Sequence, residues 1–343
     1  MFTNKKFCEK RVIFFAVLCF LMSALETAIP KPLPFFRIGL ANLPLVLALP
    51  VMGRREYFFL ALLKVLSQGL VSGTIFSYVF IFSVSGTFAS SFVMYFLHSV
   101  CSRKIISFVG ISLMGALFNN GAQIILAWFL LFGSGIKYAI PFMLLVTLVC
   151  SAALGIFACV FEKKSLWYKE ILESTDYGKI NYSITQKNNS VWQYVIAAVF
   201  VCGFVFICFT DSLIFVYSLG AVFLFASLLL RKKIRILPSF ILIFTMTLIS
   251  LFSPYGKVLW NFGKFSVTQG ALFSGLMKSG RLCAMVFASQ CMCSVRINFP
   301  GAAGRYAAGM SHYLPLLLEK KEIITRENFF SMIDSTLVDA WRS

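Results

Sequence analysis

The segment SALETAIPKPLPFFRIGLANLPLVLAL (residues 23–49) places Glu26 and Arg37, with Lys31 between them, in a mostly apolar stretch. Four prolines within fifteen positions stiffen the link between its two apolar runs. A charged side chain in the hydrocarbon of a bilayer costs a few kcal/mol or more, so it normally faces a partner, a cavity or a pathway. The purpose of these charges therefore depends on whether the flanking runs lie in a membrane.

The composition of the chain is typical of a membrane protein. Of its 343 residues, 59% are hydrophobic and only 13% are charged, and the mean hydropathy is +0.86. Soluble domains carry about 25% charged residues, so much of this surface must face lipid. The sequence predicts an all-α, polytopic helical membrane protein, with the lipid bilayer as its first partner.

Charge and cysteine usage exclude several classes of function. The net charge of +18 would suit nucleic acid only with a basic face on a soluble fold. Here the Lys and Arg residues fall in short clusters between apolar runs, as topogenic charges do. Cys291 and Cys293 have one intervening residue and no second ligand pair nearby. We expect no nucleic-acid partner, no metal site, no cofactor and no catalytic residue.

Apolar runs of about 20 residues, the length that spans a bilayer, mark the expected helices. The runs at 38–53 and 56–72 are short for a full span, so we expect them to be tilted or re-entrant. The predicted helices lie near 12–29, 38–53, 56–72, 74–99, 105–131, 138–161, 191–209, 212–230, 236–253 and 267–295.

A polar stretch, EKKSLWYKEILESTDYGKINYSITQKNNS (162–190), divides the helices into a bundle of six and a bundle of about four. We predict a first membrane domain at 1–162, a cytoplasmic linker at 163–190 and a second membrane domain at 191–343. The tail at 296–343 carries both charge signs, and we expect a cytoplasmic surface helix or loop there.

The orientation follows from the loop charges. With the N-terminus inside, thirteen basic residues of the first half fall in inner segments, and three, Lys31, Arg37 and Lys137, fall in outer ones. The basic cluster at 231–235 is also inside on this count. We predict a multi-pass protein of the inner (cytoplasmic) membrane with both termini in the cytoplasm.

The polar residues of the first six helices gather at one depth. At about 1.5 Å per residue, nearly all of them fall between the midplane and the outer surface. Lys64 and Gln68 are four residues apart and share a helix face, as do Asn119 and Gln123. The candidate substrate-binding residues are Glu26, Arg37, Asn42, Lys64, Gln68, Asn119, Asn120 and Gln123.

Two interpretations of this cluster stay open. In the structural one, Glu26 pairs with Lys64 or Arg37, and the amides hold helices together at about 1 kcal/mol each. In the functional one, the cluster lines a pocket for a small amphipathic solute, with the Pro-rich segment 30–37 as its lid. Aromatic side chains would then complete the wall, namely Phe35, Phe36, Tyr78 and Trp128.

Three segments resemble a known family. LETAIPKPLPFFRIGLANLPLVLAL, LVSGTIFSYVFIFSVSGTFASSFVMYF and GALFNNGAQIILA resemble the Gx transporter family, also named heptaprenyl diphosphate synthase component I. That family is similar to the substrate-binding S components of energy-coupling factor (ECF) transporters, which implies six helices with a ligand pocket in the outer half. Its pattern often has His at the place of Asn119 and Arg at that of Lys64. Lys cannot hold a carboxylate or phosphate bidentately as Arg can, which leaves the ligand open.

In the second half, SPYGKVLWNFGKFSVTQGALFSGLMKSGRLCAMVFASQ (253–290) resembles the transmembrane T component of the same transporters. The resemblance covers about 190–315 and implies separate ATPase subunits as partners. T components dock their ATPases through short Ala-Arg-Gly-like motifs, and Ala340-Trp341-Arg342 departs from that pattern.

Two functions follow. The first is uptake of a small vitamin- or cofactor-precursor-like solute by an S-like half joined to a T-like half. The alternative is a non-catalytic membrane subunit associated with prenyl (heptaprenyl) diphosphate synthesis. Prenyl synthases bind magnesium diphosphate through aspartate-rich motifs, whereas the four aspartates here, Asp176, Asp211, Asp334 and Asp339, are all isolated. We therefore expect that this chain is not itself an enzyme.

Overall fold

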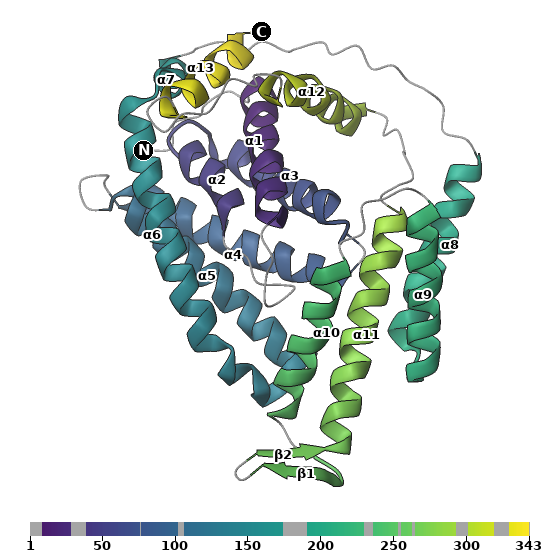
Figure 1. Cartoon of the computed structure of the whole chain (residues 1–343). Helices are drawn as coiled ribbons and strands as arrows, with labels where there is room; N and C mark the ends of the chain where they lie inside the picture. The colour runs from purple at the N-terminus through teal and green to yellow at the C-terminus, as the bar shows by residue number, and fades with distance from the viewer. Residues whose placement is uncertain are drawn as a thin grey trace.

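The computed structural model of the chain is an almost entirely helical membrane protein (Figure 1). Helices end close to the positions expected for nearly every apolar run, which confirms the predicted fold class. The structure describes residues 9–28, 39–75, 77–101, 106–173, 191–229, 236–252, 255–262, 265–292, 301–318 and 329–342.

In its described residues, the first half consists of five long helices joined by shorter helical elements. Its elements are α1 (Glu9–Ala28), η1 (Leu40–Asn42), α2 (Leu43–Ala48), α3 (Arg54–Ser72), α4 (Tyr78–Val100), α5 (Phe108–Ala127), the π-helical turn η2 (Trp128–Phe132), the 3₁₀ turn η3 (Gly133–Tyr138) and α6 (Ile140–Lys164).

The prediction of one long helix at 38–53 is wrong. That helix is reduced to the 3₁₀ turn η1 and the six residues of α2, about 9 Å at 1.5 Å per residue, which is far short of a bilayer. Gly39 precedes η1 with φ +97°, a left-handed conformation that favours glycine. Pro44 is the second residue of α2, and Pro50 lies two residues after its end. These residues stop the helix on both sides, although the whole run is apolar and α2 is buried.

Glycines let the long helices of the first half approach closely. A Cβ on Gly155 of α6 would lie 2.6 Å from Val109 Cα of α5, and one on Gly115 of α5 would lie 2.6 Å from Met94 of α4. Ser112 also donates a hydrogen bond to the Ser151 carbonyl, 3.0 Å away. The α4–α5–α6 layer therefore packs backbone against backbone.

The second half holds four helices and a β-hairpin. Its elements are α8 (Val191–Phe209), α9 (Leu213–Leu229), α10 (Ile236–Leu251), β1 (Val258–Phe262), β2 (Phe265–Thr268) and α11 (Gln269–Met292). The antiparallel hairpin was not expected from the helical reading of this region. Two residues separate its strands, which is the length of a tight hairpin turn. The strands have only five and four residues, so the sequence pattern that could have predicted the hairpin is short.

Four helices are long and apolar enough to cross a membrane among the residues that the structure describes. They are α4, α5 continued by η2, α6 and α11; the apolar parts described for α8 and α9 are shorter. No other described helix, α1 included, meets both conditions. The chain is therefore a membrane protein. Four of its described helices meet the conditions for a membrane span, fewer than the ten helices expected from the sequence.

Three further helices lie together at one end of the molecule, around the start of α1 (Figure 1). They are α7 (Leu166–Glu173), α12 (Gly301–Leu318) and α13 (Phe329–Arg342). Phe14 of α1 is fully buried among aromatic rings of all three, with 5.4 Å between its ring centroid and those of Trp167, Tyr313 and Trp341. The tail thus packs on the first half, and α7 occupies part of the expected linker; residues 174–190 of that linker lie outside the described residues.

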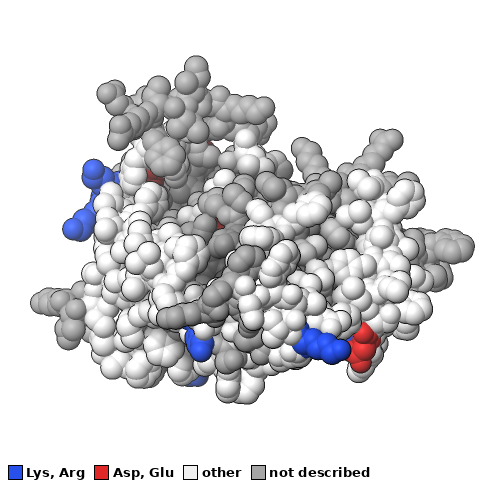
Figure 2. Space-filling view, turned by 60° about the horizontal axis from the view of Figure 1, so that its bottom comes forward, with Lys and Arg blue, Asp and Glu red and all other residues white. Residues whose placement is uncertain are grey.

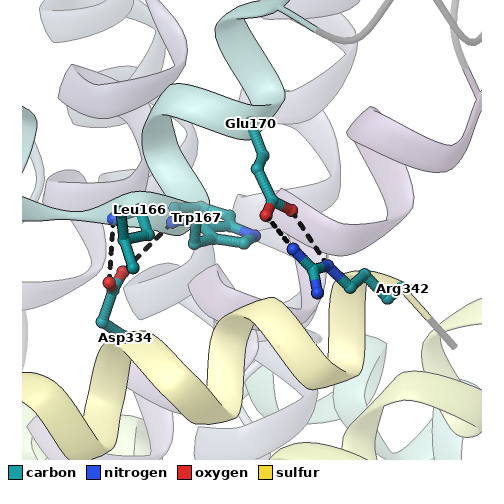
Figure 3. A network of polar contacts seen from close by, with 5 residues as sticks. All are labelled: Leu166, Trp167, Glu170, Asp334 and Arg342. Carbon is teal, nitrogen blue, oxygen red and sulfur yellow. Dashed lines mark hydrogen bonds and ion pairs between the residues drawn. The ribbon is translucent and has the colours of Figure 1, made fainter.

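A polar network joins α7 to α13 (Figure 3). The Asp334 carboxylate accepts hydrogen bonds from the backbone N–H of Leu166 at 2.8 Å and of Trp167 at 3.3 Å. Ser165 donates its hydroxyl to the same carboxylate. Ser165 is the N-cap of α7, because its Oγ accepts a hydrogen bond from the Tyr168 N–H at 3.0 Å. Asp334 of α13, which is 6% exposed, adds to this cap from outside the helix. Near the other end of α7, Arg342 forms an ion pair with Glu170.

The two halves meet away from this end. Met246 of α10 and Leu282 of α11 belong to the same apolar cluster as Val79 and Phe82 of α4. Lys278 of α11 donates a hydrogen bond to the carbonyl of a residue in η2, Leu131. Among the described residues, the contact of α10 and α11 with the first half is therefore mainly apolar, with a partly buried hydrogen bond from Lys278.

Candidate functional site

Five elements of the first half converge on one polar cavity. Their side chains come from α1, η1, α3, α4 and α5, so residues far apart in the sequence meet at one point. The lining residues are Glu26, Gly39, Ala41, Asn42, Lys64, Gln68, Ser83, Thr87, Asn119 and Gln123.

Six of the eight predicted site residues line this cavity: Glu26, Asn42, Lys64, Gln68, Asn119 and Gln123. Of the other two, Arg37 lies outside the described residues, as does the proposed lid at 30–37. Asn120 is not among the lining residues. Its Nδ2 donates hydrogen bonds to Thr147 Oγ1 and, at 3.5 Å, to the Met143 carbonyl, so it joins α5 to α6. That the six residues bind a solute stays a prediction.

Both charged groups of the cavity are buried, and each of them bonds to a residue of η1. Glu26 is fully buried and accepts a hydrogen bond from the backbone N–H of Ala41, 3.4 Å from Oε2. Lys64 is 3% exposed and donates to Asn42 Oδ1 and to Thr87 Oγ1, the latter at 3.2 Å. The turn η1 therefore bonds to both charges, through Ala41 and Asn42, and its position depends on them.

The amides of α5 form the opposite wall. Gln123 donates a hydrogen bond from Nε2 to Asn119 Oδ1, 3.5 Å away, which fixes how the two amides face each other. Gln123 is fully buried, and its Oε1 has no hydrogen-bond partner among the described residues. A buried acceptor without a donor is unfavourable by about 1–3 kcal/mol. The wall therefore offers an acceptor to any donor that enters the cavity.

Sequence reasoning missed the contribution of α4. Ser83 and Thr87 are four residues apart and line the cavity, while Gly86 between them lets α5 approach. A Cβ on Gly86 would lie 2.4 Å from Asn119 Oδ1 and 2.9 Å from Gln123 Nε2. The four-residue spacing of small hydroxyl residues beside a glycine was the available signal. In an apolar helix such a pattern is usually assigned to packing alone.

The aromatic wall predicted for the pocket does not form as expected. Phe35 and Phe36 lie outside the described residues. Tyr78 and Trp128 are not among the residues that line the cavity, and half of the Trp128 surface is exposed. The described lining is polar instead of mixed.

The cavity is nearly closed. Its volume is about 10 Å³, roughly the room that one water molecule needs. A vitamin-sized solute could enter this space only if lining elements separated. The turn η1 is three residues long, follows a left-handed glycine and bonds to both charged side chains of the cavity.

The comparisons with known proteins divide the chain at the same place as its composition. Residues 15–161 match the family model of heptaprenyl diphosphate synthase component I. The matched segment contains every residue that lines the cavity. Residues 193–295 match the model of a domain of unknown function (DUF8519). No curated protein and no solved structure matches the chain.

Proposed function

We propose that the first half of the chain binds a small, polar solute in the cavity between α1, η1, α3, α4 and α5. In this proposal the protein takes up a vitamin- or cofactor-precursor-like solute in the manner of an ECF transporter. The first half acts as the S-like binding unit, and the second half acts as the T-like unit. Separate ATPase subunits would supply the energy, and both termini would lie in the cytoplasm.

One observation carries the proposal, namely the convergence of buried polar side chains from five elements on one point. Burying a charged or amide group without full compensation is unfavourable. Polar groups inside the apolar part of a membrane protein commonly mark substrate pathways. Helix packing alone would be served by scattered polar pairs, such as Asn120 with Thr147, and does not require this convergence.

The nearly closed cavity fits a state in which the lining groups satisfy one another. Lys64 bonds to Asn42, and Ala41 of the same turn bonds to Glu26. A solute that offered equivalent hydrogen bonds could replace these contacts as η1 moved away. The exchange would leave few buried groups without a partner at any stage.

The decisive experiment is to identify the small molecule that gently purified protein retains. We expect mass spectrometry of extracted protein to find one retained polar solute. The variants Gln68→Leu and Glu26→Gln should lose it while keeping the wild-type yield and melting temperature. Gln269→Leu is the matched control, because it makes the same chemical change at an exposed residue at the start of α11. Equal retention by all variants would mean that the solute site lies elsewhere.

The description of the matching family supports a second proposal. In it the chain is a non-catalytic membrane subunit that assists heptaprenyl diphosphate synthesis. The isolated aspartates argue against catalysis by the chain itself. Purified chain should therefore show no prenyl transfer, and it should raise the activity of a synthase subunit that co-purifies with it. Co-purification with a pair of ATPase subunits instead would favour the transport proposal.

A further inference from the structure

Tryptophan and tyrosine side chains are distributed unequally between the two ends of the molecule. At the end formed by α7, α12 and α13, these rings are inside the core, and none of those described there exceeds 9% exposure: Trp167, Tyr168, Tyr306, Tyr313 and Trp341. At the other end, which we call the hairpin end because β1 and β2 lie there (Figure 1), four such rings are between 50% and 69% exposed: Trp128, Tyr138, Tyr255 and Trp260.

Exposed apolar side chains follow one another along β1 of the hairpin. Val258, Leu259 and Trp260 are consecutive residues of β1, each more than half exposed. The pairing of β1 with β2 is irregular between Val258 and Trp260, so these side chains do not alternate regularly between the two faces of the ribbon, and all three are on its surface. A two-stranded hairpin with this composition is marginal in water. Its surroundings must therefore stabilise it.

The position of the hairpin places it at the edge of the bilayer. It connects α10 to α11, and the 24 residues of α11 extend about 36 Å at 1.5 Å per residue. The hydrocarbon core is about 30 Å thick, so the end of α11 already reaches the headgroup region. The backbone N–H of Gln269 bonds to the Lys257 carbonyl at 2.8 Å, and that of Tyr255 bonds to Thr268 Oγ1 at 3.1 Å. The base of the hairpin is thereby tied to the start of α11.

The first half also places aromatic and basic side chains at the hairpin end. Tyr138 of η3 stacks near Phe252, which follows α10, with 4.4 Å between ring centroids. The ammonium of Lys137 lies 5.1 Å from the Tyr138 ring centroid, and Lys257 at the base of the hairpin is exposed. Figure 2, in which this end is turned forward, shows mostly uncharged atoms among the described residues, with a few basic groups, one of which lies beside an acidic group. Aromatic rings beside isolated lysines are typical of the bilayer interface.

We propose that the hairpin and the exposed rings of η2 and η3 form a lipid-binding girdle that lies in the headgroup region of one leaflet. The rings of Trp128, Tyr138 and Trp260 occupy the boundary between headgroups and acyl chains. Lys137 and Lys257 reach the lipid phosphates. The girdle holds α5, α6, α10 and α11 at a common depth, and thus both halves of the chain. This inference does not depend on the proposed solute.

Fluorine NMR of the full chain labelled with fluorotryptophan tests the proposal. The protein is reconstituted in phosphatidylcholine–phosphatidylglycerol vesicles that contain lipid spin-labelled near the headgroup. Trp128→Phe and Trp260→Phe assign two of the five tryptophan signals. We expect the spin-labelled lipid to broaden these two signals and a water-soluble relaxation agent to broaden them less. Trp167, which is fully buried, is the internal control and should be broadened by neither.

Two outcomes would overturn the proposal. Broadening of the Trp260 signal by the water-soluble agent alone would place the hairpin in water. A Trp260 signal that neither agent broadens would mean that protein covers the hairpin, either a second copy of the chain or another subunit. Both Trp→Phe variants change an exposed ring conservatively, so the protein is expected to fold in each case.

Discussion

Replacement of Asp334 by alanine tests whether α13 holds α7 in place. Asp334 is 6% exposed, and its carboxylate caps α7 through the backbone N–H groups of Leu166 and Trp167 and through the Ser165 hydroxyl. The helix α7 has eight residues, whereas isolated helices shorter than about 12–15 residues are marginal. Its formation therefore depends on Asp334, on the Ser165 hydroxyl, which also accepts a hydrogen bond from the Tyr168 N–H, and on the burial of its aromatic side chains.

The size of the effect follows from the bonds that are lost. Removal of an N-cap costs about 0.5–2 kcal/mol, and a buried donor left without a partner costs about 1–3 kcal/mol. Leu166 N–H is partly buried and Trp167 N–H is buried, so water can replace the carboxylate at the first more easily than at the second. We expect Asp334→Ala to lower the free energy of unfolding by about 2–4 kcal/mol. Asp334→Asn keeps one acceptor oxygen and should cost about half as much.

The assay is chemical unfolding of the full chain in detergent, followed by limited digestion with trypsin. Asp334→Ala should also speed cleavage after Lys169, an exposed residue of α7. Ser335→Ala is the control, because Ser335 is exposed and bonds only to the Met332 carbonyl of its own helix; it should stay within about 0.5 kcal/mol of wild type. An Asp334→Ala protein with wild-type stability and cleavage would refute the capping argument.

Two further predictions concern the packing of α4 against α5 and the hydrogen bond between α11 and η2. Gly86→Ala would place a Cβ 2.4 Å from Asn119 Oδ1, so it should destabilise the protein by about 1–3 kcal/mol and abolish solute retention in the extraction assay. Gly121→Ala, where a Cβ meets no atom within 4 Å, should instead leave stability unchanged or raise it by up to about 1 kcal/mol; equal effects of the two would contradict the packing argument. Lys278→Met removes the hydrogen bond to the Leu131 carbonyl and should lower the free energy of unfolding by about 1–3 kcal/mol, while wild-type stability would show that the apolar contacts alone join the halves.

Much of the fold could be predicted because long apolar runs have few alternatives in a bilayer. Helices α3 to α6 and α8 to α11 all begin and end within a few residues of their expected bounds. The prediction was wrong where glycine or proline residues interrupt an apolar run. At α2, Gly39 before the helix and the two prolines in and after it keep the helix short. The hairpin was missed because β1 and β2 are only five and four residues long. The packing of α13 on α7 could not be predicted, since no periodic pattern links Asp334 to Leu166.

The presence of a polar cluster could be predicted from the depth of its residues in the membrane. The side chains that face the cavity could not be predicted in this way. Counting residues along each helix placed Lys64 and Asn119 at similar levels in the membrane, and both line the cavity. Depth does not determine which way a side chain faces around the helix axis. Asn120 is one residue from Asn119, about 100° further around the helix, and bonds to α6 instead. The contribution of Gly86 is likewise visible only once α4 and α5 are placed side by side.

The charge of the cavity bears on which of the two proposed functions it can serve. Its described lining contains one ammonium, Lys64, and one carboxylate, Glu26. A prenyl diphosphate carries several negative charges, which proteins normally balance with magnesium held by carboxylates or with several basic side chains. Among the described residues of this cavity it would meet one cation, which already donates to Asn42 and Thr87. A neutral or zwitterionic solute fits this balance, so a role in prenyl synthesis would have to use another surface of the chain. A retained prenyl diphosphate that is lost on Lys64→Met substitution would contradict this reasoning directly.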